Sequence, residues 1–182
     1  MDARKKPEVY WVYQVAITIR DKAKATRLIN NKKLDGREYK PVIYKFPVEY
    51  GSLKGKSSRP IVVGFGPAGM ILALYLARLG LRPIVIERGQ AVDDRIQTVE
   101  KFWNTGILDN NSNIQFGEGG AGTFSDGKLQ TGVKDKTGRI AEIIKTFVEF
   151  GAPEEILYLN KPHIGTDKLV TMVKNIRVKI EE

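Results

Sequence analysis

The stretch Pro60–Gly89, PIVVGFGPAGMILALYLARLGLRPIVIERG, decides the fold. Its opening residues form a short apolar run typical of a buried parallel strand, and the glycine motif GFGPAG (64–69) follows at once. An apolar helix is predicted from the motif to Leu79, and Arg82–Glu87 is a predicted second strand. A strand, a glycine motif, a helix and a strand that ends in an acid predict, in this order, a dinucleotide-binding α/β unit.

Each residue type in the motif has a physical role. Gly64 allows a tight turn from strand to helix, Gly66 lets the backbone approach a pyrophosphate, and Gly69 lets the helix pack on the strand. Pro67 suits the first helical turn because its missing N–H costs little there, and Ala68 continues the helix. The helix N-terminus offers unpaired N–H groups and a partial positive charge to phosphates.

The acid at the end of the second predicted strand bears on the choice of cofactor. Glu87 stands where a carboxylate accepts hydrogen bonds from an adenosine ribose. It argues against NADP because it would repel the 2′-phosphate, although Arg88 beside it keeps that option open. This fingerprint alone does not separate FAD from NAD.

A second glycine-rich segment, Ser112–Leu129, follows a helix predicted over residues 93–104. Five glycines in eleven residues predict irregular backbone whose N–H groups approach a planar or anionic ligand closely. A flexible surface loop would not explain the interleaved Phe116 and Phe124. This segment therefore favours FAD over NAD.

Six stretches carry a resemblance to a known family: GFGPAG, ERG, FWNTG, SNIQFGEGGAGTFSDGKL, FGAPEEILY and KPHIGTDKL. Together they resemble a family of uncharacterised FAD-dependent (NAD/FAD-utilising) dehydrogenases, from about Asp2 to the last residue. The resemblance implies a small N-terminal α/β domain, an FAD-binding Rossmann-like domain and a further substrate or cap domain. It implies an oxidoreductase that transfers hydride or electrons between FAD and an unidentified small-molecule or redox substrate, with NAD(P)H as a candidate electron donor.

The resemblance also implies roles for individual residues. It implies that the ADP half of FAD is held by Gly64, Gly66, Pro67, Ala68, Gly69 and Glu87. It places a loop near the flavin or its pyrophosphate, with the candidate contacts Gly119, Gly120, Gly122, Thr123 and Ser125. Arg88 and Arg95 are candidates for ribose or phosphate contacts. No catalytic residue is assigned, and His163, the single histidine, is either a group that faces the flavin or a structural loop residue.

The amino-acid composition excludes several kinds of structural site and protein class. The chain has 182 residues, of which none is Cys, which excludes disulfides, Cys-ligated zinc and iron–sulfur clusters within it. We expect no metal site. No apolar run approaches the roughly 18 residues that a membrane span needs, and the first residues do not form a secretory signal. We expect a cytoplasmic protein that does not bind membranes.

The charge is unevenly placed. Residues 1–59 hold 15 Lys and Arg against 6 Asp and Glu, whereas residues 60–182 hold 15 of each. This asymmetry predicts a small basic α/β module at 1–57 and the N-terminal part of an FAD/NAD(P)-binding Rossmann-like domain at 58–182. An alternative is a non-catalytic module whose basic part binds RNA or an acidic partner. Because no RNA-binding motif accompanies the charge, we expect no specific nucleic-acid partner.

In the basic module, strands are predicted at Glu8–Arg20 and Val42–Glu49, and a helix capped by Asp21 is predicted from Lys22 to about Asn30. A last helix, capped by Thr166 and Asp167, is predicted to run to the final residue.

The family continues from this helix into a further strand, so the chain resembles an N-terminal fragment, inactive and poor in FAD when alone. An incomplete parallel sheet has an open edge, through which we expect self-association.

Overall fold

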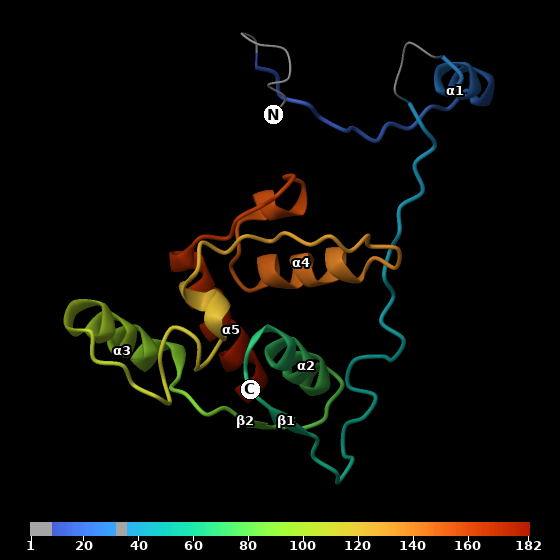
Figure 1. Cartoon of the computed structure of the whole chain (residues 1–182). Coiled ribbons are helices and arrows are strands. Elements are labelled where there is room, and N and C mark those ends of the chain that lie inside the picture. The colour runs from blue at the N-terminus through green and yellow to red at the C-terminus, as the bar shows by residue number, and fades with distance from the viewer. Residues whose placement is uncertain (1–8, 32–35) are drawn as a thin grey trace. The chain divides into compact units, whose positions relative to one another are not determined.

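The computed structural model describes residues 9–31 and 36–182 and divides the chain into two compact units, Met1–Val42 and Ile43–Glu182 (Figure 1). The first unit contains the helix α1 (Lys22–Ile29). The second unit contains, in chain order, β1 (Ile61–Val63), α2 (Pro67–Arg78), β2 (Ile84–Ile86), α3 (Val92–Thr105), the 3-10 helix η1 (Ala121–Phe124), α4 (Arg139–Glu149), the 3-10 helix η2 (Glu154–Leu157) and α5 (Thr166–Glu181).

In the first unit, the predicted helix is confirmed and the predicted strand is wrong. A carboxylate oxygen of Asp21 accepts the N–H of Lys24 at 3.1 Å and caps α1. Residues 9–20 form no strand beyond an isolated bridge at Tyr10, and Glu8 lies outside the described residues. Their Val, Ile and aromatic side chains favour extended backbone, but a strand also needs a neighbouring backbone to bond with.

The strand predicted at Val42–Glu49 is also absent from the described structure. In the second unit, Phe46 instead stacks on Tyr75 of α2, with ring centroids 4.9 Å apart. The N–H of Leu53 donates to the carbonyl of Leu79 at 2.9 Å. These contacts attach the segment that precedes β1 to α2. The division between the units falls after Val42, ahead of the predicted module boundary between residues 57 and 58.

The sheet has two parallel strands, in which Ile61 pairs with Ile84 and Val63 with Ile86. Helix α2 connects the strands and covers one face, where Val62 is buried (Figure 1). On the other face, Ile61 and Val63 are 63% and 80% exposed. The mixed α/β class is therefore confirmed.

The core lies between α2, α5 and the elements around them. The predicted last helix is confirmed as α5, and it presents an apolar face to the core. On this face Leu169, Met172, Val173 and Ile176 are all buried. Its predicted capping is wrong, because Gly165 occupies the N-cap position and no side chain makes a cap hydrogen bond. In the part of the chain that the structure describes, no helix is long and apolar enough to cross a membrane.

Candidate functional site

The turn between β1 and α2 depends on two glycines. Gly64 has φ +88°, a left-handed conformation that side chains disfavour. A Cβ on Gly69 would lie 2.0 Å from the carbonyl oxygen of Gly64, so only glycine lets the helix pack this closely on the strand. The folded chain itself thus requires glycine at both positions.

Gly66 differs from these two glycines. Its φ of −74° and ψ of −176° suit any residue, and a Cβ there would meet no atom of the chain within 4 Å. Nothing in the described protein therefore requires glycine at this position. The space beside it lies at the N-terminus of α2, where Pro67 starts the helix. Among the hydrogen bonds of the described residues, none uses the N–H of Ala68 or Gly69, as expected for a first helical turn.

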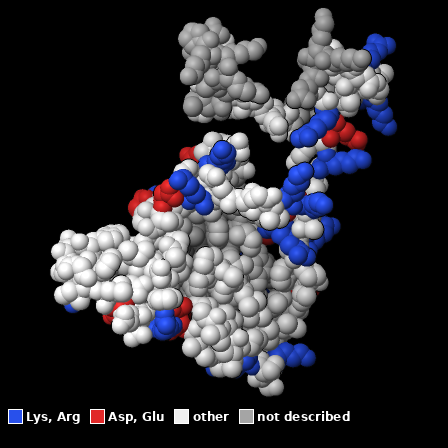
Figure 2. Space-filling model, viewed as in Figure 1, with Lys and Arg blue, Asp and Glu red and all other residues white. Residues whose placement is uncertain are grey.

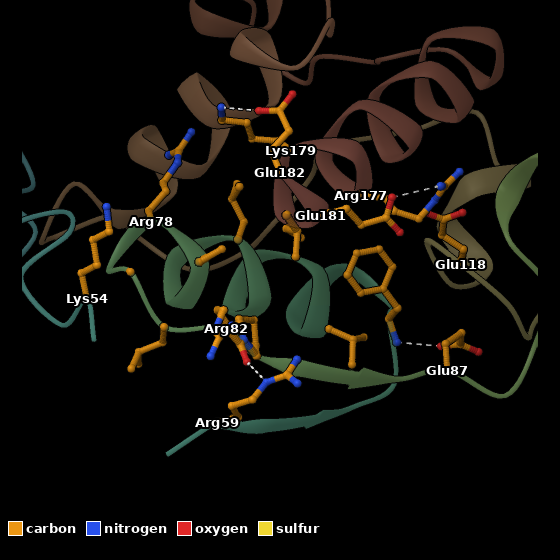
Figure 3. Close-up of a pocket in the computed structure, with 18 of the residues that line it drawn as sticks. Lys54, Arg59, Arg78, Arg82, Glu87, Glu118, Arg177, Lys179, Glu181 and Glu182 are labelled. Carbon is orange, nitrogen blue, oxygen red and sulfur yellow. Dashed lines mark hydrogen bonds and ion pairs between the residues drawn. The ribbon is translucent and has the colours of Figure 1, made fainter. Parts of the chain in front are cut away.

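The carboxylate of Glu87 is joined directly to this turn. It accepts the N–H of Phe65 at 2.6 Å through one oxygen (Figure 3). Its other oxygen accepts the N–H of Gly89 at 2.9 Å. Glu87 follows β2 and is half-buried, so it is held in place and stays accessible. The structure thus brings this predicted residue against the glycine motif.

The second glycine-rich segment packs on the first, backbone against backbone. The N–H of Gly119 donates to the carbonyl of Phe65 at 2.8 Å. A Cβ on Gly120 would lie 3.3 Å from Gly66 Cα and from Pro67 Cδ, and Gly120 itself has φ +69°. Residues 54 positions apart in the sequence therefore meet at the N-terminus of α2.

Three further candidates lie in or beside η1, where the sequence predicted irregular backbone. A Cβ on Gly122 would meet nothing within 4 Å, as at Gly66. The exposed Ser125 donates its hydroxyl to the Gly122 carbonyl at 2.7 Å. Thr123 is buried and its hydroxyl approaches the Glu118 carbonyl at 3.4 Å, so it faces the inside of the loop.

The structure gives Arg95 a role other than the expected contact with a ligand. It is fully buried on α3, and its guanidinium donates at 2.7–2.9 Å to the carbonyls of Asn113, Ile114, Glu118 and Gly120. It also lies over the ring of Phe124, 4.8 Å from the centroid. Burial lowers the pKa of Arg95, although the charges of Glu87 and Glu118 oppose the shift. The structure thus makes Arg95 a positioning residue that holds the loop.

Glu118 is a site residue that sequence reasoning missed. It is 3% exposed, and one carboxylate oxygen accepts the N–H of Val92, at the start of α3, while the other accepts Nε of Arg177 at 2.8 Å. The N-cap residue of α3, Ala91, makes no side-chain cap hydrogen bond, so the distant carboxylate of Glu118 accepts a free N–H at the start of this helix instead. The signal available in the sequence was an acid between glycines, in Gly117-Glu-Gly-Gly120.

The remaining candidates lie at the surface. Arg88 is exposed and its Cζ lies 3.9 Å from the centroid of the Phe116 ring. His163 is exposed and forms an isolated antiparallel bridge with Lys128. Nothing in the described structure connects His163 to the glycine motif.

A groove with a volume of about 1430 Å³ lies between α2, β2 and α5, and Phe65 is the residue of the glycine motif that lines it (Figure 3). The groove is lined by the acids Glu87 and Glu118 and by the basic side chains Lys54, Arg59 and Arg82, and the two acids lie at the opposite end from Lys54 (Figure 3). Glu87 can therefore be reached by a ligand from the groove.

The charge distribution follows the sequence count. Figure 2 shows the Lys and Arg side chains concentrated along the first unit and the segment that leads out of it, while the visible face of the second unit is mostly uncharged. Among the described residues, no group of three His, Asp or Glu side chains could hold a metal ion.

The chain is similar to a known protein whose activity has not been defined. An uncharacterised protein of Clostridium beijerinckii is 45% identical over 181 residues, which cover 100% of this chain and 33% of that protein. The chain therefore spans about a third of the length of the curated relative that it matches. No protein-family model matches the chain.

Proposed function

We propose that the second unit binds the ADP half of FAD as part of a cytoplasmic FAD-dependent oxidoreductase with a Rossmann-like sheet. The observation that carries the proposal is the open space at Gly66. Neither backbone conformation nor packing requires a glycine there, whereas a pyrophosphate bound at the start of α2 would. Open space alone also occurs at Gly132, so the argument depends on the position of Gly66 at the N-terminus of α2, where phosphates bind.

The residues around this space fit a dinucleotide. The N–H groups of Ala68 and Gly69 are oriented as those of a first helical turn, which suits phosphate oxygens. The carboxylate of Glu87 has lone pairs left over after its two backbone bonds and would accept the ribose hydroxyls. A negative group at this position favours FAD or NAD over a cofactor with a 2′-phosphate.

The second glycine-rich segment supports FAD over NAD. Gly120 packs on Gly66 and Pro67, so the segment borders the proposed pyrophosphate position. Gly122, which also has open space beside it, extends the site past that point. Arg95 holds this backbone in place by donating hydrogen bonds to the carbonyls of Glu118 and Gly120. FAD, when bound, would supply the hydride or electron transfer, and these residues would bind and orient it.

The reaction of the whole protein stays a wider proposal, because the chain spans about a third of its curated relative. We propose an unidentified small-molecule or redox substrate, with NAD(P)H as a candidate electron donor. The basic N-terminal third has no assigned role, and specific nucleic-acid binding is not part of the proposal.

The test is ligand binding to the purified chain with matched glycine variants. Gly66→Val places a branched side chain in the proposed pyrophosphate position. Gly132→Val is the control, since a Cβ there also meets nothing within 4 Å and its φ is not left-handed. Calorimetric titration with ADP, which represents the half of FAD that these residues would hold, should show binding to the unchanged chain and to Gly132→Val, and none to Gly66→Val. Equal affinity in all three proteins, or tighter binding of NAD than of FAD, would contradict the proposal.

A further inference from the structure

Beyond the carboxyl end of β2, a cation and an aromatic ring are stacked at the surface. The Cζ atom of Arg88 lies 3.9 Å from the centroid of Phe116, the closest such approach between a guanidinium and a ring among the described residues. Arg88 is exposed and Phe116 is 42% exposed. At this distance the planar guanidinium covers one face of the ring, and its own outer face stays open.

The backbones that carry the pair are fixed against each other. A Cβ on Gly89 would lie 2.4 Å from the Cα of Gly117, so the residues next to Arg88 and Phe116 touch through their main chains. The N–H of Asn113 donates to the Phe116 carbonyl at 3.0 Å, and the N–H of Phe116 approaches the Asn113 side-chain oxygen at 3.2 Å. The pair is therefore a pre-formed surface between two ordered segments.

Within the described residues, Arg88 contacts the Phe116 ring but has no acidic partner. Among the described residues, it forms neither an ion pair nor a side-chain hydrogen bond, whereas Arg78 and Arg177 each pair with a Glu. Its planar face and its N–H groups are thus available to a ligand. Arg88 directly follows Glu87, the proposed ribose-binding residue, so the pair lies one residue along the chain from that group.

We propose that Arg88, held flat on Phe116, forms a stacking platform for the purine base of the dinucleotide. The proposal rests on the proposed function and adds a determinant of base specificity to it. A purine has two fused rings and overlaps the guanidinium more fully than a pyrimidine does, so the platform selects adenine over uracil. Phe116 is a positioning residue that keeps the guanidinium flat, and Arg88 touches the base.

The experiment titrates the full 182-residue chain with ADP and with UDP in a calorimeter. The variants are Arg88→Lys, which keeps the charge without the planar group, and Phe116→Leu, which removes the support. Phe116→Trp is the conservative rescue, and Tyr158→Leu, at a side chain that is 74% exposed, is the control.

The unchanged chain should bind ADP about 10-fold more tightly than UDP, and both Arg88→Lys and Phe116→Leu should remove this preference through weaker ADP binding. Phe116→Trp and Tyr158→Leu should retain it. ADP affinity unchanged in Arg88→Lys and Phe116→Leu would overturn the platform alone, as would equal affinity of the unchanged chain for ADP and UDP. Failure of the unchanged chain to bind ADP and FAD would overturn the platform and the proposed function together.

Discussion

The carboxylate of Glu87 accepts the backbone N–H of Phe65 at 2.6 Å, within the glycine motif itself. The end of β2 and the turn after β1 are thereby joined by a side chain, in addition to the bonds of the sheet. The proposed ribose-binding group and the proposed phosphate-binding backbone therefore keep a fixed spacing before a ligand arrives, which lowers the ordering cost of binding.

Replacing Glu87 should separate binding from folding. Glu87→Ala should weaken ADP binding by about 1–3 kcal/mol, because a charged acceptor is lost. Glu87→Gln keeps an oxygen that can accept one backbone N–H and should lose less. Calorimetric titration of both variants measures the difference. If Glu87→Ala binds ADP as tightly as the unchanged chain, the ribose role is wrong.

The glycines of the motif should respond to valine in opposite ways. Gly69→Val drives a side chain toward the Gly64 carbonyl, 2.0 Å from the Cβ position, and should destabilise the fold by at least about 3 kcal/mol. Gly66→Val has open space and should unfold at nearly the unchanged denaturant midpoint, with nucleotide binding abolished. Equilibrium unfolding in urea measures both variants, and a large loss of stability in Gly66→Val would contradict the expectation.

Removing Arg95 should loosen the second glycine-rich segment. Arg95→Met keeps the apolar stem but leaves buried carbonyls of residues 113–120 without their donor, which should cost at least about 3 kcal/mol. Hydrogen exchange should then accelerate at the N–H groups of Gly119 and Gly120. Lys101→Met, at an exposed position of the same helix, is the control and should leave exchange unchanged.

Asp93 makes the stability of the chain depend on acid pH. Hydrogen bonding and ion pairing with Lys174, together with the charge of Arg177, lower the pKa of Asp93 from its usual 3.8. Since the folded-state pKa is the lower one, the contribution is complete above 3.8 and is lost as the pH falls through the lowered pKa.

Asp93→Asn should therefore reduce stability at pH 7 by less than about 1 kcal/mol, because the pair is partly exposed. The difference between the two proteins should vanish once the carboxyl is protonated. Urea unfolding as a function of pH measures this, and a difference that persists in strong acid would contradict it.

The uncovered face of the sheet should promote self-association. Ile61 and Val63 are exposed on this face. In β1, alternate residues bond to β2, so the N–H and C=O groups of Ile61 and Val63 point away from β2 and could pair with a further strand. Val63→Lys should weaken association about 10-fold, whereas Val133→Lys, also at an exposed valine, should not. Sedimentation equilibrium measures both, and a chain that is monomeric without any substitution would refute the expectation.

The region from Pro60 to Gly89 could be predicted because every local signal agreed. The apolar strand, the glycine turn, Pro67 at the helix start and Gly80 at its end all favour the same structure, and the observed β1, α2 and β2 follow it closely. The two strands that were predicted wrongly, at Glu8–Arg20 and Val42–Glu49, were supported by side-chain propensity alone. A strand also depends on a partner, which a linear pattern does not reveal.

Helix α4 was not predicted from the sequence, because the residues at its N-terminus are not those that usually begin a helix. Its N-cap is Gly138 with φ +78°, and the carboxylate of Asp135 reaches the N–H of Ala141, six residues on, at 2.9 Å. The roles of Arg95 and Glu118 escaped prediction for a related reason. Whether a charged side chain is buried depends on which segments fold over it, and those segments are distant in the chain.

The ion pair of Glu118 with Arg177 bears on how the protein emerges from the ribosome. The two residues are 59 positions apart, so the ribosome completes the glycine-rich segment well before it adds the helix that secures it. A nascent chain that has folded β1, α2 and β2 still lacks the partner of a buried carboxylate. Glu118 therefore gains this partner only after α5 has been synthesised and has packed against the glycine-rich segment.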